Sequence, residues 1–314
     1  PTNYAIETMI EAVANHLGLD RLDVRQRNMI RHDEFPYLIP SGTTYDSGNF
    51  ETVIGKVFAR QSYKDLIAER DRLRAGGKLA GIGIAACLEP NGGNSSFEPL
   101  LNPKNANTTW MESVRVSVDL SGAITVTMHT TSAGQGHETL AATVLGEVLE
   151  IDPDKIRVMR SDSINAMPSN SPVGSRMAIM LGGATFHAAN KIKDKLLAIG
   201  AHDLGIPLDR AVYNEGVVFD RDTPQSKRTW AELVLIAHRY AHRMPDGMEP
   251  GLSVSHIMHV PTGGKLPTAD GRVQMYPCFS FEFHLVLMTI DPDLGRPEIV
   301  QYKVGHDCGT VISP

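Results

Sequence analysis

The chain has 314 residues, of which 42% are hydrophobic, and its formal net charge is −6. These values describe a globular chain with one large or two smaller domains and exclude an intrinsically disordered protein. The acidic balance argues against nucleic-acid binding, which needs a basic face, and no apolar run is long enough to span a membrane. The three cysteines are too widely spaced for a zinc cluster or a disulfide framework, so a reducing, cytoplasmic compartment is expected.

Helical periodicity dominates the first quarter of the chain. An apolar stripe from Tyr4 to Val13, followed by Gly18, predicts the first helix. Further helices are predicted at 20–31, 50–58 and 63–74. The range 31–47 contains three breaking residues, Pro36, Pro40 and Gly42, and is expected to be an exposed connection.

Strands and helices alternate in the rest of the chain. Alternating or small apolar residues predict strands at 79–88, 112–119, 124–131, 156–159, 253–260, 280–290 and 299–304, and a hairpin at 211–220. Helices are predicted at 137–150 and 230–244, and a long helix is predicted to follow Arg176 and to run to about residue 202. The long loop at 89–108 is rich in Asn, Gly and Pro, and its length indicates a functional or mobile segment.

A glycine turn lies between a strand and a helix in the stretch 124–150. Gly134 and Gly136 leave the backbone free to take positive φ and to approach a ligand closely. Gln135 lies between them and offers an amide with both donors and acceptors. The following helix presents unpaired N–H groups and a partial positive charge, which suit a phosphate. The structural alternative is a plain tight connection.

A second strand–loop–helix unit follows the first. Its loop ends in Ser171-Pro172-Val173-Gly174-Ser175-Arg176 immediately before a long helix. Ser171, Ser175 and Arg176 at a helix N-terminus form a second candidate anion site, with an ordinary helix cap as the alternative. Because two such units occur in succession, we expect Gln135 and Ser175 to meet at one cleft around a shared anionic ligand.

Histidines provide only a weak metal signal. His238 and His242 have the i, i+4 spacing of a helical metal site, but no nearby carboxylate motif completes it. A solvated or capping pair is therefore the preferred interpretation. His256 and His284 lie within predicted strands and are expected to be residues of a polar face.

The motifs together resemble the large subunit of the molybdenum hydroxylases, the relatives of xanthine dehydrogenase, aldehyde oxidase and aerobic carbon monoxide dehydrogenase. The resemblance rests on Gly134-Gln135-Gly136-His137-Glu138-Thr139, on Ser171-Pro172-Val173-Gly174-Ser175 and on Asp307-Cys308-Gly309. Tyr4-Ala5-Ile6-Glu7 and Glu112-Ser113-Val114-Arg115-Val116 also fit. The matches occur in order along the whole chain.

The resemblance implies an α+β fold of layered mixed sheets with packed helices. Residues 1–34 would then be the end of the first molybdopterin-binding domain. Residues 35–314 would form the second molybdopterin-binding domain, truncated at its C-terminus. Both ends of the chain look like cuts inside a larger protein.

The implied cofactor is molybdopterin with molybdenum, as the cytosine dinucleotide if the source is bacterial. In the family the pterin dithiolene holds the metal, so no side chain is predicted as a metal ligand. The implied cofactor-binding residues are Gly134, Gln135, Gly136, His137, Glu138, Thr139, Ser171, Gly174, Ser175 and Arg176.

The implied activity is oxidation of an aldehyde, N-heterocycle or similar small substrate, with water as the oxygen source. The family's general base is a glutamate expected outside this chain, as is the substrate-pocket segment, so we expect the chain alone to be inactive and to hold cofactor poorly. The implied partners are the remaining molybdopterin-binding segment and iron–sulfur and FAD subunits or domains, with neither nucleic acid nor membrane.

Two other hypotheses remain open from the sequence. One is a non-catalytic scaffold subunit of the same fold in a multi-subunit dehydrogenase. The other is an unrelated nucleotide-binding enzyme with similar glycine turns, which ranks last because the chain lacks both a Walker lysine and the Rossmann glycine pattern.

Overall fold

The computed structural model describes residues 2–93, 104, 110–170, 172–259, 267–274 and 276–314. The chain divides into two compact units. The first unit comprises Pro1–Asn91 and Pro267–Thr310, and the second comprises Gly92–Leu266 and Val311–Pro314. The boundary predicted at residue 34 divides the chain differently and stays a prediction.

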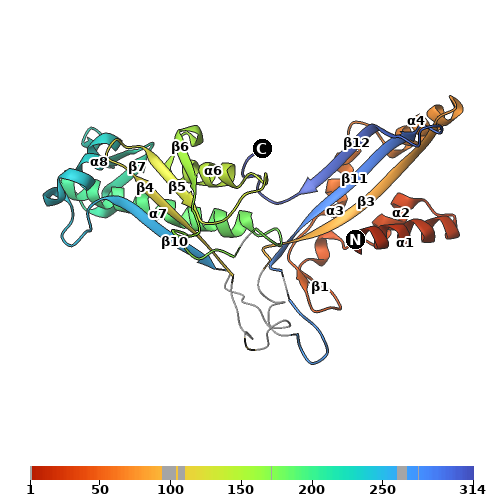
Figure 1. Cartoon of the computed structure of the whole chain (residues 1–314), viewed down its shortest axis with the longest axis horizontal. Coiled ribbons are helices and arrows are strands. Elements are labelled where there is room, and N and C mark those ends of the chain that lie inside the picture. Colours follow the sequence, from red (N-terminus) through yellow and green to blue (C-terminus); the bar gives the residue numbers. More distant parts are fainter. Residues whose placement is uncertain (1, 94–103, 105–109, 171, 260–266, 275) are drawn as a thin grey trace. The chain divides into compact units, whose positions relative to one another are not determined.

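The first unit is built on three long antiparallel strands in the order β12-β11-β3 (Figure 1). They are β3 (Leu79–Asn91), β11 (Cys278–Ile290) and β12 (Pro297–Asp307). Alternate residues of β11 are buried, as expected for a sheet with one covered face. That face packs against α3 (Phe50–Val57) and α4 (Tyr63–Ala75), which contribute Val53, Ile54 and Leu66 to the apolar core.

The two N-terminal helices close the outer edge of β3. They are α1 (Thr2–Leu17) and α2 (Arg21–Arg27). The Glu7 carboxylate accepts a hydrogen bond from the Ala86 backbone N–H at 3.1 Å and another from Arg25 Nε at 2.8 Å. An exposed strand edge invites pairing with other chains, and this contact blocks part of it.

Short elements connect α2 to α3. They are a 3₁₀ turn (His32–Glu34) and the two-residue strands β1 (Tyr37–Leu38) and β2 (Thr44–Tyr45), which pair with each other. Most residues of this connection are at least partly exposed, in agreement with the prediction for 31–47.

The second unit is built on a four-stranded mixed sheet in the order β10-β4-β5-β6. Its strands are β4 (Met111–Val118), β5 (Ile124–Met128), β6 (Ile156–Arg160) and β10 (Leu252–His259). Only β5 and β6 are parallel, and α6 (His137–Leu149) connects them. This crossover places the first glycine turn at the C-terminal end of β5.

Helix α7 (Met177–Leu204) is the central helix of the second unit and packs on α6, β4 and β10 (Figure 1). Its buried residues, among them Leu181, Ala188 and Ile192, meet Val116 and Val126 of the sheet in one apolar core. The remaining elements are β7 (Ala211–Asn214), β8 (Val217–Asp220), β9 (Lys227–Arg228), α8 (Trp230–Arg239) and 3₁₀ turns at Pro153–Lys155, Leu208–Arg210 and Ala241–Arg243.

The predicted mixed-sheet class is confirmed, with local differences. The helix expected at 20–31 ends at Arg27, and Asn28 caps it in a non-helical conformation. The helix expected at 230–244 ends at Arg239 because Tyr240 leaves the helical region, and a 3₁₀ turn follows. Strand β3 continues to Asn91, three residues beyond the prediction. Most of the loop predicted at 89–108 lies outside the described residues.

Helices in the described part of the chain are all too short or too polar to cross a lipid bilayer.

Candidate functional site

The first glycine turn carries two left-handed residues. Gly134 has φ 99° and Gly136 has φ 76°, conformations that disfavour any residue with a Cβ. A Cβ built at either position would meet no heavy atom within 4 Å. The glycines are therefore required by backbone conformation and not by packing, and the space above them is open.

The turn leaves the start of α6 without a side-chain cap. Gly136 is the N-cap residue and has no side chain to accept a hydrogen bond from the first turn, in which the Glu138 carboxylate accepts one from its own N–H. Thr139 in that turn is exposed. The other leading N–H groups and the positive end of the helix dipole can interact with an anion.

Two predicted site residues of α6 support this turn through their side chains. His137 is only 4% exposed, and its Nδ1 lies 3.2 Å from the Thr131 carbonyl oxygen. Glu138 forms an ion pair with Arg160 at the end of β6. Burial opposes the charge of Glu138, but its own backbone N–H, Ser132 and Arg160 outweigh burial and hold its pKa below the ordinary value.

Gln135 folds back onto its own turn. Its Oε1 accepts a hydrogen bond from the Ala133 backbone N–H at 2.6 Å, and its side chain is exposed. This contact is the one expected of a turn-stabilising residue. The amide nitrogen makes no hydrogen bond to another described residue, so it is available to a ligand.

The second turn also carries two left-handed residues, and one of them is not glycine. Gly174 has φ 66° and Ser175 has φ 48°. A serine in this region is strained, and such strain concentrates at functional sites. No side chain caps the start of α7, whose N-cap residue is Arg176. Ser171, predicted to bind the cofactor, lies outside the described residues.

The second turn is paired with the start of the loop that the sequence analysis marked as functional or mobile. Gly92 N–H donates to the Ser175 carbonyl at 3.1 Å, and Gly93 N–H donates to the Gly174 carbonyl at 2.8 Å. A Cβ at Gly93 would lie 2.8 Å from the Gly174 oxygen. Only glycine fits at Gly93 without displacing the turn, so this residue belongs to the candidate site.

Arg176 lies inside the protein and is paired there. Its side chain and that of Glu112 are both 0% exposed, and Nη1 donates to the Glu112 carboxylate at 2.5 Å. The guanidinium plane also lies near the Trp110 ring, 5.6 Å from its centroid. The structure therefore gives Arg176 an internal partner, and a direct contact with a ligand stays a prediction.

Two buried polar side chains at the end of β5 have atoms without a partner among the described residues. His129 is 9% exposed, and its Nδ1 accepts a hydrogen bond from Met167 N–H at 3.1 Å. The neutral ring then carries its proton on Nε2, which has no acceptor, and Thr130 Oγ1 is also unsatisfied. Burial, followed by the nearby Arg115 charge, lowers the pKa of His129. Unsatisfied buried polar atoms are uncommon and indicate a missing ligand or water.

The predicted site residues thus gather at the N-terminal ends of α6 and α7, two helices that pack against each other. Both turns belong to the second unit. That Gln135 and Ser175 share one cleft stays a prediction. Sequence reasoning missed Glu112, Gly93 and His129 as site residues. Two signals were available: the Glu112 motif, matched without assigning a role, and the loop 89–108, noted as functional or mobile.

The four other histidines considered in the sequence analysis are in structural positions. His238 Nε2 lies 2.9 Å from the Val118 carbonyl oxygen, whereas His242 belongs to the 3₁₀ turn after α8, so they form no helical pair. His256 stacks on His187 with ring centroids 4.7 Å apart. His284 contacts Glu282 and Tyr302 through its two ring nitrogens. Within the described ranges, no three potential metal-ligating side chains come together.

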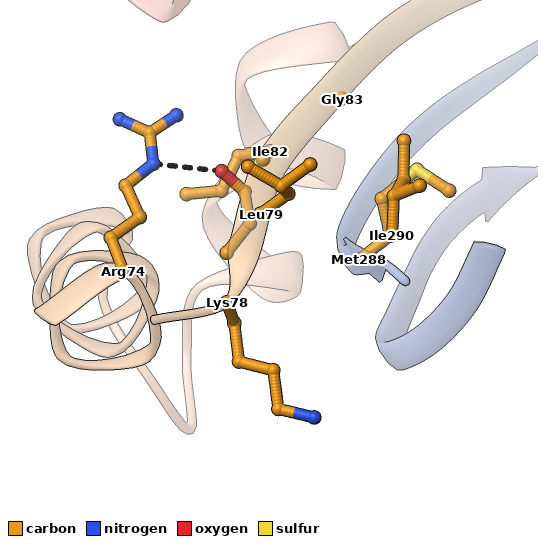
Figure 2. Close-up of a pocket in the computed structure, with 9 residues that line it drawn as sticks. Arg74, Lys78, Leu79, Ile82, Gly83, Met288 and Ile290 are labelled. Atoms are coloured by element: carbon orange, nitrogen blue, oxygen red, sulfur yellow. Dashed lines mark hydrogen bonds between the residues drawn. The ribbon is translucent and has the colours of Figure 1, made fainter. Parts of the chain in front are cut away.

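A separate groove of about 680 Å³ lies on the first unit (Figure 2). Leu79, Met288 and Ile290 line it from the ends of β3 and β11. Figure 2 shows Arg74 bound to the strand, where its Nε donates to the Ala80 carbonyl at 2.8 Å. None of the predicted site residues lines this groove.

Comparison with known proteins gives a consistent result. Residues 56–314 match the family model of the molybdopterin cofactor-binding domain. The chain is 30% identical over 317 residues to the carbon monoxide dehydrogenase large chain of Afipia carboxidovorans and 27% identical over 310 residues to the nicotine 6-hydroxylase large subunit of Paenarthrobacter nicotinovorans. The aligned regions cover 99% of this chain but only 37% and 36% of those proteins.

Solved structures give the same pattern. The reconstituted CO dehydrogenase from Oligotropha carboxidovorans superimposes with a TM-score of 0.80 at 29% identity, over 99% of this chain and 37% of that one. Quinoline 2-oxidoreductase from Pseudomonas putida 86 also has a TM-score of 0.80, and its 24% identity supports the fold alone.

Proposed function

Because the chain belongs to the family of molybdopterin cofactor-binding domains, we propose that it forms part of the large subunit of a molybdenum hydroxylase and holds the cofactor through its two glycine turns. The proposed enzyme oxidises an aldehyde, N-heterocycle or similar small substrate, with water as the oxygen source.

The pair of uncapped helix starts is the observation that carries this proposal. Neither α6 nor α7 has a side-chain hydrogen bond at its N-cap. Each is preceded by two residues with left-handed backbone, a conformation found in turns whose N–H groups form anion-binding concavities. The phosphate groups of a molybdopterin are the kind of anion that such helix starts bind. The donor chemistry of the chain therefore fits the cofactor.

The unsatisfied donors at the end of β5 give independent support. His129 Nε2 and Thr130 Oγ1 lack partners within the described part of the chain, and they directly precede the first turn. A buried donor left unpaired costs about 1–3 kcal/mol. A polar ligand bound at this turn would remove that cost.

Each predicted residue has a distinct proposed role. Gly134 and Gly136 allow close approach of the backbone, and the Gln135 amide nitrogen donates to the cofactor. The N–H groups at His137 and Thr139 bind phosphate at the start of α6, and Glu138, bound to its own N–H and to Arg160, supports that turn.

The second turn acts in the same way. Gly174 and Ser175 present donors at the start of α7. Ser171, which lies outside the described residues, stays a predicted ligand, as does Arg176, whose charge is paired with Glu112. The bound cofactor supplies molybdenum, at which the substrate is oxidised. The residues of this chain bind and orient the cofactor, and no general base is assigned among them.

We also propose the chemical form of the cofactor and the groups that accept the electrons. The cofactor is the cytosine dinucleotide form, and iron–sulfur and FAD subunits or domains accept the electrons in the cytoplasm. The relatives support an assembly, since their names include large subunits and a subunit gamma of the 6-hydroxypseudooxynicotine dehydrogenase complex.

The test uses the complete large subunit expressed with its partners, because this chain spans little more than a third of its relatives. Gly136→Ala introduces a Cβ at φ 76°, and Gly247→Ala is a matched control with φ 77° and equally open surroundings. Both changes cost similar strain, about 1–2 kcal/mol. Molybdenum and cytosine nucleotide per folded protein are then measured.

We expect Gly136→Ala to lower cofactor content roughly tenfold and Gly247→Ala to leave it unchanged. Equal content in both variants would contradict the assignment of the first turn. A wild-type complex that is folded, inactive and free of molybdenum would favour the scaffold alternative.

A further inference from the structure

One buried carboxylate connects β4 to the segment that leads into α7. Glu112 Oε1 accepts hydrogen bonds from Arg176 Nη1 at 2.5 Å and from Asn170 N–H at 3.0 Å, and Oε2 accepts one from Ser169 Oγ at 2.7 Å. These partners lie 57 to 64 residues away in sequence. A single side chain thus fixes both ends of the segment that contains the second turn.

The start of β4 adds backbone contacts to the same segment. Met111 N–H donates to Asn170 Oδ1 at 2.7 Å, and the Met111 carbonyl accepts from Asn170 N–H at 3.1 Å. Arg176 Nη2 donates to the same carbonyl at 3.3 Å. Ser113 Oγ donates to the Pro168 carbonyl at 2.8 Å. Residues 168–170 are therefore held firmly against the sheet.

The charges involved are completely removed from water, since both side chains of the Glu112–Arg176 pair are 0% exposed. Such a pair seldom adds stability relative to apolar residues of similar volume, although removing one partner alone is strongly destabilising. The pair contributes to geometry, because a carboxylate that accepts three hydrogen bonds fixes the positions of its three donors.

We infer that Glu112 is a positioning residue for the cofactor: through Arg176, Ser169 and Asn170 it holds Gly174 and Ser175 in the left-handed conformation that opens the start of α7 to phosphate. This inference rests on the proposed function. It also reassigns Arg176, which acts on the turn from inside the protein.

The experiment compares two ways of removing the pair in the complete complex. Glu112→Gln leaves the Arg176 charge buried and uncompensated. Glu112→Leu combined with Arg176→Met removes both charges and replaces them with apolar groups of similar size. In both proteins Ser169 and Asn170 lose a strong acceptor, so the turn should loosen in both.

The expected result separates positioning from stability. Glu112→Gln lowers the melting temperature by roughly 10 °C, and the double variant recovers most of that loss. Molybdenum per folded protein remains about tenfold or more below wild type in both variants. If molybdenum content recovers together with the melting temperature, the pair has only a structural role and the inference is wrong.

Hydrogen exchange provides a readout that needs no cofactor. Amides 173–176 should exchange roughly tenfold faster in both variants, while amides 133–139 are unchanged. Ser169→Ala keeps the ion pair and should show a smaller acceleration at an unchanged melting temperature, which tests the inference even if the double variant does not fold.

Unchanged exchange in all three proteins would overturn the inference. If the wild-type complex lacks molybdenum, the proposed function fails, yet the exchange data still decide whether Glu112 holds the turn.

Discussion

The turns before α6 and α7 have similar backbones but different supports. The first turn is held by nearby contacts, such as Gln135 to Ala133 and His137 to Thr131, at two and six residues. The second is held by contacts with Gly93 and Glu112, the latter 64 residues away. The first turn should therefore change locally when mutated, whereas changes around the second should also affect the stability of the unit.

The largest difference in unfolding free energy is expected between substitutions of Arg176 and of Arg160. Arg176→Met leaves Glu112 charged in a fully buried place and should cost about 3–5 kcal/mol of unfolding free energy. Arg160→Met removes the partner of Glu138, where the side chains are 59% and 32% exposed, and should cost under about 1 kcal/mol. Denaturant unfolding of both variants measures the difference. Similar losses would mean that the two turns are supported alike.

Gly93→Ala should disturb the second turn alone. The added Cβ would lie 2.8 Å from the Gly174 carbonyl oxygen, and overpacking of this kind costs about 1–3 kcal/mol. Gly83→Ala is the control, because its Cβ meets no atom within 4 Å. Hydrogen exchange should accelerate at 173–176 and not at 133–139. Acceleration at both turns would show that they are coupled.

Gln135→Ala tests the first turn with a smaller effect on stability. Loss of the bond to Ala133 should cost about 0.5–1.5 kcal/mol. In the complete enzyme we expect molybdenum content or turnover to fall by about one to two powers of ten. Gln135→Glu should be worse, because its carboxylate faces the negative charge of the cofactor. If only the melting temperature changes, Gln135 is a turn residue and not a site residue.

Removing the charge of Glu138 should have the smallest effect on stability, and that effect should depend on pH. Its pKa is lowered in the folded state from an ordinary value of 4.5, so its contribution to stability is present above that value and is lost as pH falls through the folded pKa. Glu138→Gln should therefore lower the melting temperature slightly at pH 7 and progressively less below about pH 4.5. A difference that is constant from pH 7 to pH 3 would exclude this carboxylate as its source.

The difference between the two turns also explains which features could be predicted from the sequence. Gly134, Gly136 and the apolar spacing of α6 lie within one short stretch, so the strand, turn and helix were predictable from local pattern. Gln135 as the centre of the turn was identified for the same reason. The mixed-sheet class followed from the alternation of strands and helices.

The supports of the second turn could not be predicted in this way. Gly93 supports the turn because it contacts the carbonyl of Gly174, 81 residues later in the chain. Glu112 supports it because its charge is buried beside Arg176. Tertiary packing creates both relations, and neither leaves a local periodicity. Arg176 looked like an exposed phosphate ligand for the same reason, since its burial depends on β4.

The central claim is that both helix starts bind one molybdopterin, and a density map of the complete, cofactor-loaded complex tests it most directly. We predict cofactor oxygen atoms within about 3.2 Å of backbone nitrogens at the start of α6 and at Gly174–Ser175. A cofactor bound elsewhere, with both turns facing solvent, would contradict it.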